Sequence, residues 1–256
     1  MTTTRQNGSL YTNLQNNIAT IEFGHPSSNS FPSELLRRLT KELNSISEND
    51  AISVIILKSE GEKAFCAGAS FDELVAISNL EEGEKFFAGF ANVINAMRTC
   101  GKLIIGRVQG KTVGGGVGLV AACDYVLATE KAAIKLSEFT IGIGPFVIEP
   151  AVQRKIGLAA LSELTLDAIS WKTAYWAKEK GLYARVFETV KELDEEVEIL
   201  ASKLASYNPS ALAEMKKVLW KNTQNWDELL VERAVISGKL VLSDFTKKAL
   251  ATFSKK

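Results

Sequence analysis

The pattern of apolar and polar residues alternates between two forms over the first 190 residues. Short apolar runs, of which 54–57 and 103–108 are the clearest, are typical of strands buried on both faces of a parallel sheet. Longer stretches with apolar residues every three or four positions are typical of amphipathic helices. Strands that alternate with helices predict βαβ units. The expected strands are 10–15, 18–23, 54–57, 103–108, 125–128 and 133–136, and the expected helices are 32–48, 84–98 and 117–122.

Two of these segments are defined by the residues beside them. Asn16 and Asn17 separate two strand-like runs, which predicts a hairpin. Pro32 opens a helix, because proline fits the first turn, and Asn49 follows its end. The apolar residues expected on one face of this helix are Leu35, Leu36, Leu39, Leu43 and Ile46.

After about residue 190 the strand pattern stops. Amphipathic helices are expected at 192–204, 210–222 and 226–245, with Pro209 between the first two. We therefore expect an α/β fold in two parts. The expected division is a core over residues 1–190 and an all-helical C-terminal region over residues 191–256.

The composition narrows the function classes. Lys and Arg number 30 and Asp and Glu number 30, so the net charge is zero, which disfavours a nucleic-acid or anionic-membrane binder. No apolar run approaches the ~18 residues of a transmembrane helix, and the first residues lack the apolar core of a signal peptide. The three cysteines form no C-x-x-C pair, and His25 is the single histidine. We expect a cytoplasmic protein without disulfides, a metal site or a histidine-based triad.

Two glycine-containing turns, each between a buried strand and a helix, are candidates for chemistry. The first is CAGAS at 66–70, where Ser70 and Glu73 have the spacing of a capping box. The second is GGG at 114–116, which matches no phosphate-loop or dinucleotide motif. Helix starts carry unpaired N–H groups, so two such turns at neighbouring strand ends can aim two amides at one oxygen, as in an oxyanion hole. The ordinary alternative is that these glycines serve only tight packing.

Glu138 is the third candidate, because it follows a strand and precedes a glycine-rich turn. A carboxylate in a turn beside apolar residues can act as an acid or base, although a solvated loop carboxylate is the commoner case. Other polar residues favour structural interpretations, such as a cap or turn role for Asp124. The tryptophans interpreted as helix-packing residues are Trp171, Trp176, Trp220 and Trp226.

Several segments, taken in order, carry a family resemblance. KAFCAGASFD at 63–72 resembles an FxAGAD signature, and 109–124 resembles a G…GGG…ACD segment. LSE at 136–138, with the glycine and proline that follow, resembles a catalytic-glutamate segment. The family with these features is the enoyl-CoA hydratase/isomerase, or crotonase, family. The resemblance extends from about Leu14 to Phe253 and includes GLY at 181–183 and the C-terminal helices.

The resemblance implies a spiral β-β-α core and a C-terminal region that builds a homotrimer or a dimer of trimers. It implies an acyl-CoA substrate, in which coenzyme A is part of the substrate and no separate cofactor is needed. It implies that the amides of Ala69 and Gly115 bind the thioester oxygen and that Glu138 is the general acid and base. The implied substrate-binding residues are Ala67, Ala69, Ser70, Phe71, Asp72, Gly115, Gly118, Pro145, Phe253 and Lys256.

The chain departs from the family pattern in one important place. Hydratases of this family usually place two glutamates around the substrate water; Glu138 matches the second, and the first falls at Gly118. We expect the space beside Gly118 to hold a second water or a branched substrate. Ser70 replaces the aspartate of the usual turn, and as helix caps the two residue types are nearly equivalent.

Three functions follow from these residues. One carboxylate with an oxyanion hole suffices for a Δ3-Δ2 enoyl-CoA isomerase. The segments 117–124 and 144–150 resemble bacterial methylglutaconyl-CoA hydratase-like members of leucine degradation, which also tend to lack the first glutamate. We expect a hydratase, for a substrate such as 3-methylglutaconyl-CoA, with the isomerase as the alternative. A non-catalytic acyl-CoA-binding subunit is the third interpretation. The sequence leaves the acyl length and the choice between trimer and hexamer open.

Overall fold

Two sheets organise the chain, which the computed structural model describes from residue 7 to residue 253. The strands are β1 (Ser9–Gln15), β2 (Ile18–Gly24), β3 (Val54–Ser59), β4 (Ala64–Cys66), β5 (Leu103–Val108), β6 (Lys111–Val113), β7 (Tyr125–Thr129), β8 (Ile134–Lys135) and β9 (Arg185–Phe187). The large sheet has the order β1-β2-β3-β5-β7-β9, and the small sheet has the order β4-β6-β8. β1 and β2 pair antiparallel, and the other neighbouring strands pair in parallel.

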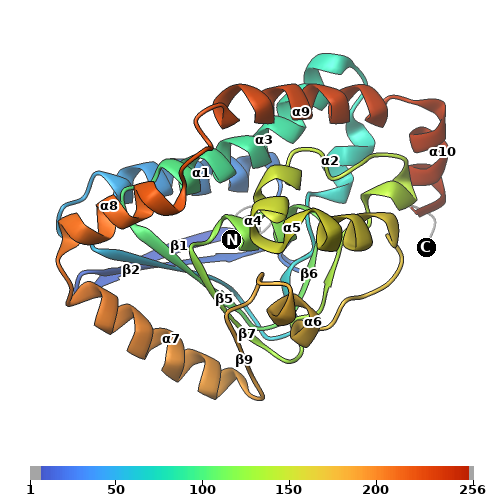
Figure 1. Ribbon diagram of the computed structural model, residues 1–256. Coiled ribbons are helices and arrows are strands. Elements are labelled where there is room, and N and C mark those ends of the chain that lie inside the picture. The colour runs from blue at the N-terminus through green and yellow to red at the C-terminus, as the bar shows by residue number, and fades with distance from the viewer. Residues whose placement is uncertain (1–6, 254–256) are drawn as a thin grey trace, which may run out of the picture.

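Helices cover both faces of the large sheet, as Figure 1 shows. The helices are α1 (Ser33–Ser47), α2 (Phe71–Ala76), α3 (Leu80–Thr99), α4 (Gly115–Ala122), the 3₁₀ turn η1 (Glu138–Ile141), α5 (Glu149–Leu166), α6 (Ala174–Glu179), α7 (Val190–Ala205), α8 (Pro209–Leu219), α9 (Trp226–Val241) and α10 (Asp244–Phe253). In Figure 1, α7 lies below the sheet and α1, α3 and α9 lie above it.

The chain alternates between the two sheets. β3 of the large sheet is followed by β4 of the small sheet, β5 by β6, and β7 by β8, with a helical segment after each pair. This order is the β-β-α spiral that the resemblance implied. Because β4, β6 and β8 are parallel neighbours, the segments that follow them leave the small sheet at one edge. That edge carries 66–70, 114–116 and 136–138, the three segments singled out in the sequence.

Residues of the central strands are buried on both faces of the sheet. Val54 and Ile56 pack in a cluster with residues of α7. Ile55 and Leu57, on the opposite face, belong to the main core with residues of α1 and α3. Burial of both faces explains why β3 appears in the sequence as a continuous apolar run instead of an alternating one.

The predicted hairpin and first helix are confirmed. β1 and β2 pair around Asn16 and Asn17, which have φ angles of 53° and 62° and so form the left-handed two-residue turn that suits a hairpin. α1 follows Pro32, and every one of its predicted core residues is buried.

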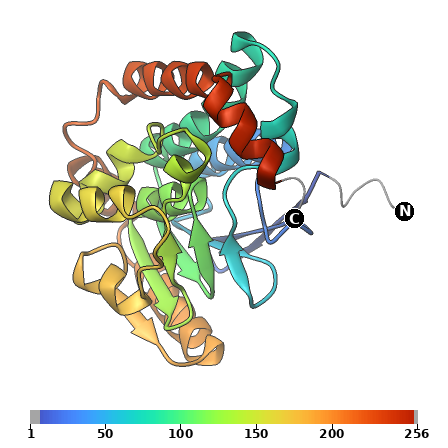
Figure 2. The same cartoon turned by 90° about the vertical axis from the view of Figure 1, so that its right-hand side faces the viewer.

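The single helix predicted at 226–245 is wrong, because the chain breaks between α9 and α10. The Oγ of Ser243 accepts a hydrogen bond from the Thr246 amide (3.3 Å), so Ser243 caps the start of a new helix. α10 then turns toward α2 and η1 and packs against both, on the side of the molecule seen in Figure 2. After β9 the described chain forms only helices, but the role of residues 191–256 in oligomerisation stays a prediction.

Asp124, predicted to be a cap or turn residue, joins the C-terminal region to the core. Its carboxylate accepts hydrogen bonds from the Lys216 ammonium (2.8 Å), the Trp220 indole (2.7 Å) and the Ile104 amide (2.7 Å). The Asp124 and Lys216 side chains are 4% and 3% exposed, so this ion pair is buried. α8 is thereby fixed against the start of β5. Trp171, in contrast to Trp220, is 39% exposed in a loop, so its interpretation as a helix-packing residue is wrong.

Candidate active site

The two glycine turns lie side by side at the edge of the small sheet. A Cβ placed on Gly68 would be 3.2 Å from the Val113 carbonyl oxygen and 3.7 Å from the Gly115 nitrogen. Gly68 has a φ of 91°, which glycine adopts without strain. Any larger residue at this position would be strained and would press on the second turn.

The backbone around Ala69 and Gly115 leaves the amides of these two residues without a visible partner in the described part of the chain. Phe31 pairs in parallel with Ala69 through the Gly68 carbonyl and the Ser70 amide, so the Ala69 N–H points away from Phe31. Gly115 is the first residue of α4, where N–H groups have no partner within the helix. In the described chain, neither amide donates a hydrogen bond outside the regular elements. The arrangement can stabilise a developing oxyanion.

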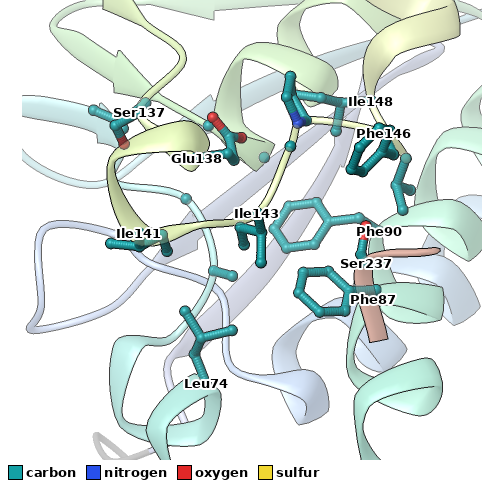
Figure 3. Close-up of a pocket in the computed structure, with 18 of the residues that line it drawn as sticks. Leu74, Phe87, Phe90, Ser137, Glu138, Ile141, Ile143, Phe146, Ile148 and Ser237 are labelled. Atoms are coloured by element: carbon teal, nitrogen blue, oxygen red, sulfur yellow. The ribbon is translucent and has the colours of Figure 1, made fainter. Parts of the chain in front are cut away.

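The carboxylate of Glu138 faces the second turn. A Cβ placed on Gly114 would lie 3.0 Å from Oε1 of Glu138. Figure 3 shows the Glu138 side chain rising from η1, above the apolar side chains of Ile143 and Phe90 in that view. Gly114 has a φ of 53° and a ψ of −123°, a backbone conformation that favours glycine.

The surroundings of Glu138 change the pKa of its carboxyl group. Its Oε2 is buried and has no hydrogen-bond partner among residues 7–253. Loss of solvation raises the pKa of Glu138 to about 7, and a hydrogen bond from its own backbone N–H opposes that rise. Both protonation states are therefore populated near neutral pH, as an acid-base catalyst requires.

A cavity of about 360 Å³ surrounds this carboxylate. Its walls are mostly apolar and come from α2, α3, the η1 region and α9 (Figure 3). The sequence analysis did not identify the aromatic residues of α3 or Ser237 of α9 as part of the site. The wall residues of these two helices are Phe86, Phe87, Phe90 and Ser237, and the residues missed elsewhere in the wall include Lys135, Phe146 and Ile148.

The structure brings most of the predicted site residues together. Those that line the cavity are Ala67, Ala69, Phe71, Gly115, Glu138 and Pro145. Asp72 is exposed in the first turn of α2 and does not line the cavity, so its contact with coenzyme A stays a prediction. The backbone of Phe253 ends α10, its side chain is outside the described part, and Lys256 lies outside the described residues.

Ser70 has a structural role, and half of the predicted capping box is present. The Glu73 amide donates to Oγ of Ser70 (3.3 Å), which caps α2. The Glu73 carboxylate does not return to Ser70; it accepts hydrogen bonds from the Ser33 amide (2.9 Å) and hydroxyl (2.6 Å). Ser70 thus holds the first turn in place, and Glu73 joins it to α1.

The prediction of open space beside Gly118 is wrong. A Cβ on Gly118 would lie 2.6 Å from Cβ of Ile148, so the isoleucine side chain fills the position. Gly118 is buried and does not line the cavity; Ile148 does. Close packing between α4 and the segment before α5 explains the difference, because a glycine lets the two backbones approach.

Among the described residues, neither the cysteine thiols nor a cluster of metal-binding side chains forms a second catalytic centre. Burial raises the pKa of the Cys66 thiol and of the Cys123 thiol to about 12, so neither is a ready nucleophile. Within residues 7–253, no three or more His, Cys, Asp and Glu side chains gather as metal ligands would. No helix of that range is long and apolar enough to cross a membrane.

Comparisons with known proteins identify relatives of this chain. The sequence model of the enoyl-CoA hydratase/isomerase family matches residues 13–253. A peroxisomal Δ(3,5)-Δ(2,4)-dienoyl-CoA isomerase from Arabidopsis thaliana is 29% identical over 82% of this chain and 80% of its own length. A short-chain-enoyl-CoA hydratase from Clostridium acetobutylicum is 26% identical over 93% of this chain and 92% of its own. The crystal structure of an enoyl-CoA hydratase from Bacillus halodurans has the same fold, with a TM-score of 0.87 and 22% identity over 95% of this chain and 99% of that one.

Proposed function

The chain belongs to the enoyl-CoA hydratase/isomerase family, and from that premise we propose that it adds water to an α,β-unsaturated acyl-CoA, or removes it, with one glutamate. The observation that carries the proposal is the Glu138 carboxylate, whose Oε2 is buried without a hydrogen-bond partner among the described residues and which lies beside the Gly114 turn in a cavity that Ala69 and Gly115 also line. The printed names of several relatives are those of hydratases, which also supports it.

In the proposed reaction, two backbone amides first bind the thioester oxygen of the substrate. The thioester oxygen accepts hydrogen bonds from Ala69 and Gly115, and these bonds strengthen as the oxygen gains charge. Each such donor supplies ~3–4 kcal/mol of transition-state stabilisation. Coenzyme A is part of the substrate, and the residues of the site supply the acid-base chemistry without a separate cofactor.

Glu138 then serves as base and acid in turn. Its carboxylate takes a proton from water while the water oxygen bonds to the β carbon and the enolate forms. The resulting carboxylic acid returns the proton to the α carbon, so the product is one water heavier. A pKa near 7 suits both steps, because the ionised and neutral forms are close in free energy.

A second candidate function is supported by Ile148. Its side chain stands where family hydratases carry the first glutamate, so the cavity offers one carboxylate. Transfer of a double bond from the β,γ to the α,β position needs only one base: Glu138 takes a proton from the α carbon and returns it to the γ carbon. This reaction is a Δ3-Δ2 enoyl-CoA isomerisation.

Several finer features belong to the same proposal. A branched substrate such as 3-methylglutaconyl-CoA, a homotrimer or dimer of trimers and a cytoplasmic location follow from the sequence resemblance. A non-catalytic acyl-CoA-binding subunit is the competing proposal, and turnover decides between them.

The deciding experiment compares three substrates. The purified protein is incubated with crotonyl-CoA, 3-methylglutaconyl-CoA and a 3-enoyl-CoA, while absorbance of the conjugated thioester and product mass are followed. Loss of conjugation with a gain of one water supports the hydratase. Gain of conjugation at constant mass supports the isomerase.

A matched pair of variants tests the residue assignment. Glu138→Gln is expected to lose ~10²–10⁴-fold in kcat, as is typical of a lost general base. Glu130→Gln removes an exposed carboxylate after β7 and serves as the control. A folded Glu138→Gln protein with nearly full activity would show that the assignment is wrong.

A further inference from the structure

The side chain of Cys66 lies between the two turns that carry the Ala69 and Gly115 amides. Cys66 is the last residue of β4, it is fully buried, and it does not line the cavity. A Cβ placed on Gly116 would lie 2.7 Å from Cβ and 2.8 Å from Sγ of Cys66. The first turn therefore begins with a side chain that packs directly against the second turn.

The thiol of Cys66 also holds the first turn in shape. Its Sγ accepts a hydrogen bond from the Gly68 amide (3.3 Å) and lies 3.9 Å from the Gly68 carbonyl oxygen. Burial raises the pKa of this thiol to about 12, so the group stays neutral and the sulfur accepts through a lone pair. The residue after Gly68 is Ala69, so the thiol orients the peptide group next to the first proposed donor.

The second turn is enclosed between Cys66 and Phe90. A Cβ placed on Gly115 would overlap the Phe90 ring, so that ring packs against Gly115 while Cys66 packs against Gly116. Side chains in a protein interior are closely packed, and removal of one leaves space into which its neighbours shift. Loss of the Cys66 sulfur would therefore free the second turn on one side and the Gly68 peptide on the other.

The spacing of the two amides decides whether both can reach one oxygen. Hydrogen bonds weaken steeply as their length and angle depart from the best values. Cys66 is one residue that contacts both turns, beside Gly68 in the first and Gly116 in the second. Its side chain is outside the cavity wall, so it can act on the substrate only through those turns.

We propose that Cys66 is a positioning residue, whose side chain sets the spacing of the Ala69 and Gly115 amides so that both donate to the thioester oxygen. The proposal rests on the function proposed above, in which these amides bind that oxygen. A protein without the sulfur should still bind the thioester, but the oxygen should gain less stabilisation as its charge develops.

A second cysteine with the same local contact provides the matched control. Cys100 follows α3, is buried, and does not line the cavity. Its Sγ accepts a hydrogen bond from the Lys102 amide (3.4 Å), again two residues along the chain. Cys66→Ala and Cys100→Ala each remove one buried sulfur and one such hydrogen bond, so urea denaturation should show similar losses of stability.

The kinetic test uses whichever of the three enoyl thioesters the wild type converts fastest. Cys66→Ala should lower kcat by ~10- to 100-fold, as expected for a small displacement of one oxyanion donor. Its KM should stay within ~3-fold of the wild type, because the lost interaction belongs to the transition state. Cys66→Ser should recover most of the activity, since a hydroxyl also accepts a hydrogen bond. Cys100→Ala should keep the kcat of the wild type.

A measurement without turnover reports on the two amides directly. Butyryl-CoA, isotopically labelled at the thioester carbonyl carbon, is bound to each protein, and the carbonyl stretch is recorded by infrared difference spectroscopy. Hydrogen bonds to the oxygen weaken the C=O bond, so the stretch should lie at lower frequency in the wild-type complex than in free butyryl-CoA. Cys66→Ala should lose about half of that shift, because one of two donors leaves the oxygen. Cys100→Ala should retain all of it.

Three results would overturn the proposal. One is a Cys66→Ala protein with the full carbonyl shift and the kcat of the wild type. Another is an equal loss of kcat in Cys66→Ala and Cys100→Ala, which would be a general effect of lost stability. If Cys66→Ala does not fold, Gly116→Ala replaces it, because the added methyl group presses the second turn away from Cys66. A full carbonyl shift in folded Gly116→Ala is the third.

The outcomes also distinguish this inference from the proposed reaction. A wild type that shows the carbonyl shift and loses part of it in Cys66→Ala, but converts no enoyl thioester, supports the positioning role and overturns the reaction. A wild type that hydrates crotonyl-CoA, with the same kcat and carbonyl shift in Cys66→Ala, does the reverse.

Discussion

The side chain of Ile148 lies against Gly118, so close that a Cβ on the glycine would be 2.6 Å from Cβ of the isoleucine. Gly118 belongs to α4 and Ile148 to the segment before α5, and these two helices pack together. By the sequence resemblance, position 118 is where family hydratases carry the first glutamate, and here an apolar side chain from outside the helix fills the space beside it. Glycine at 118 and isoleucine at 148 form one packing unit.

Gly118→Ala should destabilise the protein. The added methyl group overlaps Ile148, and overpacking of this kind costs ~1–3 kcal/mol. Ile148→Gly in the same chain removes the overlapping Cβ, so the double variant should lose less stability than the two single variants together. Urea denaturation of all four proteins gives the coupling free energy.

Gly101→Ala is the control for this double-mutant cycle. A Cβ on Gly101 would lie 3.7 Å from its nearest neighbours, the carbonyl and hydroxyl oxygens of Ser47. The free energy of unfolding of Gly101→Ala should change by less than ~0.5 kcal/mol, apart from the intrinsic difference between glycine and alanine. Additive losses at Gly118 and Ile148 would contradict the packing unit.

The activity should depend on the ionisation of Glu138. The proposed reaction begins with a carboxylate, and burial raises its pKa to about 7. We expect kcat/KM to rise with pH, to reach half its maximum near pH 7 and to fall ~10-fold per unit well below that. A rate profile on crotonyl-CoA from pH 5 to pH 9 measures the midpoint. A midpoint near the ordinary value of 4.5 would mean that the carboxylate is solvated during catalysis.

The same carboxylate should lower the stability of the folded protein at high pH. Its pKa rises from 4.5 to about 7 on folding, so the stabilising contribution of the neutral form is complete below pH 4.5 and is lost as pH rises through 7. Glu138→Gln cannot ionise and should be more stable than the wild type at pH 8, by ~1–3 kcal/mol. The difference should vanish near pH 4.5. Urea denaturation at both pH values tests this, and an equal difference at both would contradict it.

Long, regular segments were predictable from the sequence because their local patterns agree with their environment. The central strand 54–57 is apolar on both faces, and α1 has a one-sided apolar pattern after Pro32. β4 and β6 were not predicted, because each has only three residues and β6 contains exposed Lys111. Such strands are defined by their neighbours in the small sheet, not by their own sequence.

Part of the candidate site was also predictable, because some of its residues lie in short segments with a clear local pattern. Glu138 and the two glycine turns belong to short contiguous segments, and parallel strands bring such segments to one edge. The apolar walls come from α3 and α9, which meet only in the folded chain. Close contact of Gly83 with Gly238 allows that meeting, and nothing in either segment alone indicates it.

The buried ion pair between Asp124 and Lys216 should be sensitive to loss of either partner. Asp124→Asn or Lys216→Met alone leaves one buried charge without its partner and should cost ~3–5 kcal/mol. The double variant should cost less than the sum of the two. Lys217→Met, which removes an exposed partner of Glu214, should cost less than ~1 kcal/mol. Denaturation midpoints of the four variants test this, and additive losses would contradict a direct pair.

Gly114→Ala should lower kcat, and the loss should be larger than the loss caused by a strained backbone alone. Gly114 has a positive φ and a Cβ position 3.0 Å from Oε1 of Glu138, so alanine strains the turn and also displaces the carboxylate. Gly61 offers the matched control, because its φ is 75° and a Cβ there meets nothing within 4 Å. Both variants should lose ~1–3 kcal/mol of stability from the strained backbone. Only Gly114→Ala should lose kcat, by ~10²-fold, since small displacements of a catalytic group have effects of that size. Equal activity in the two variants would mean that the contact between Gly114 and Glu138 does not position the carboxylate.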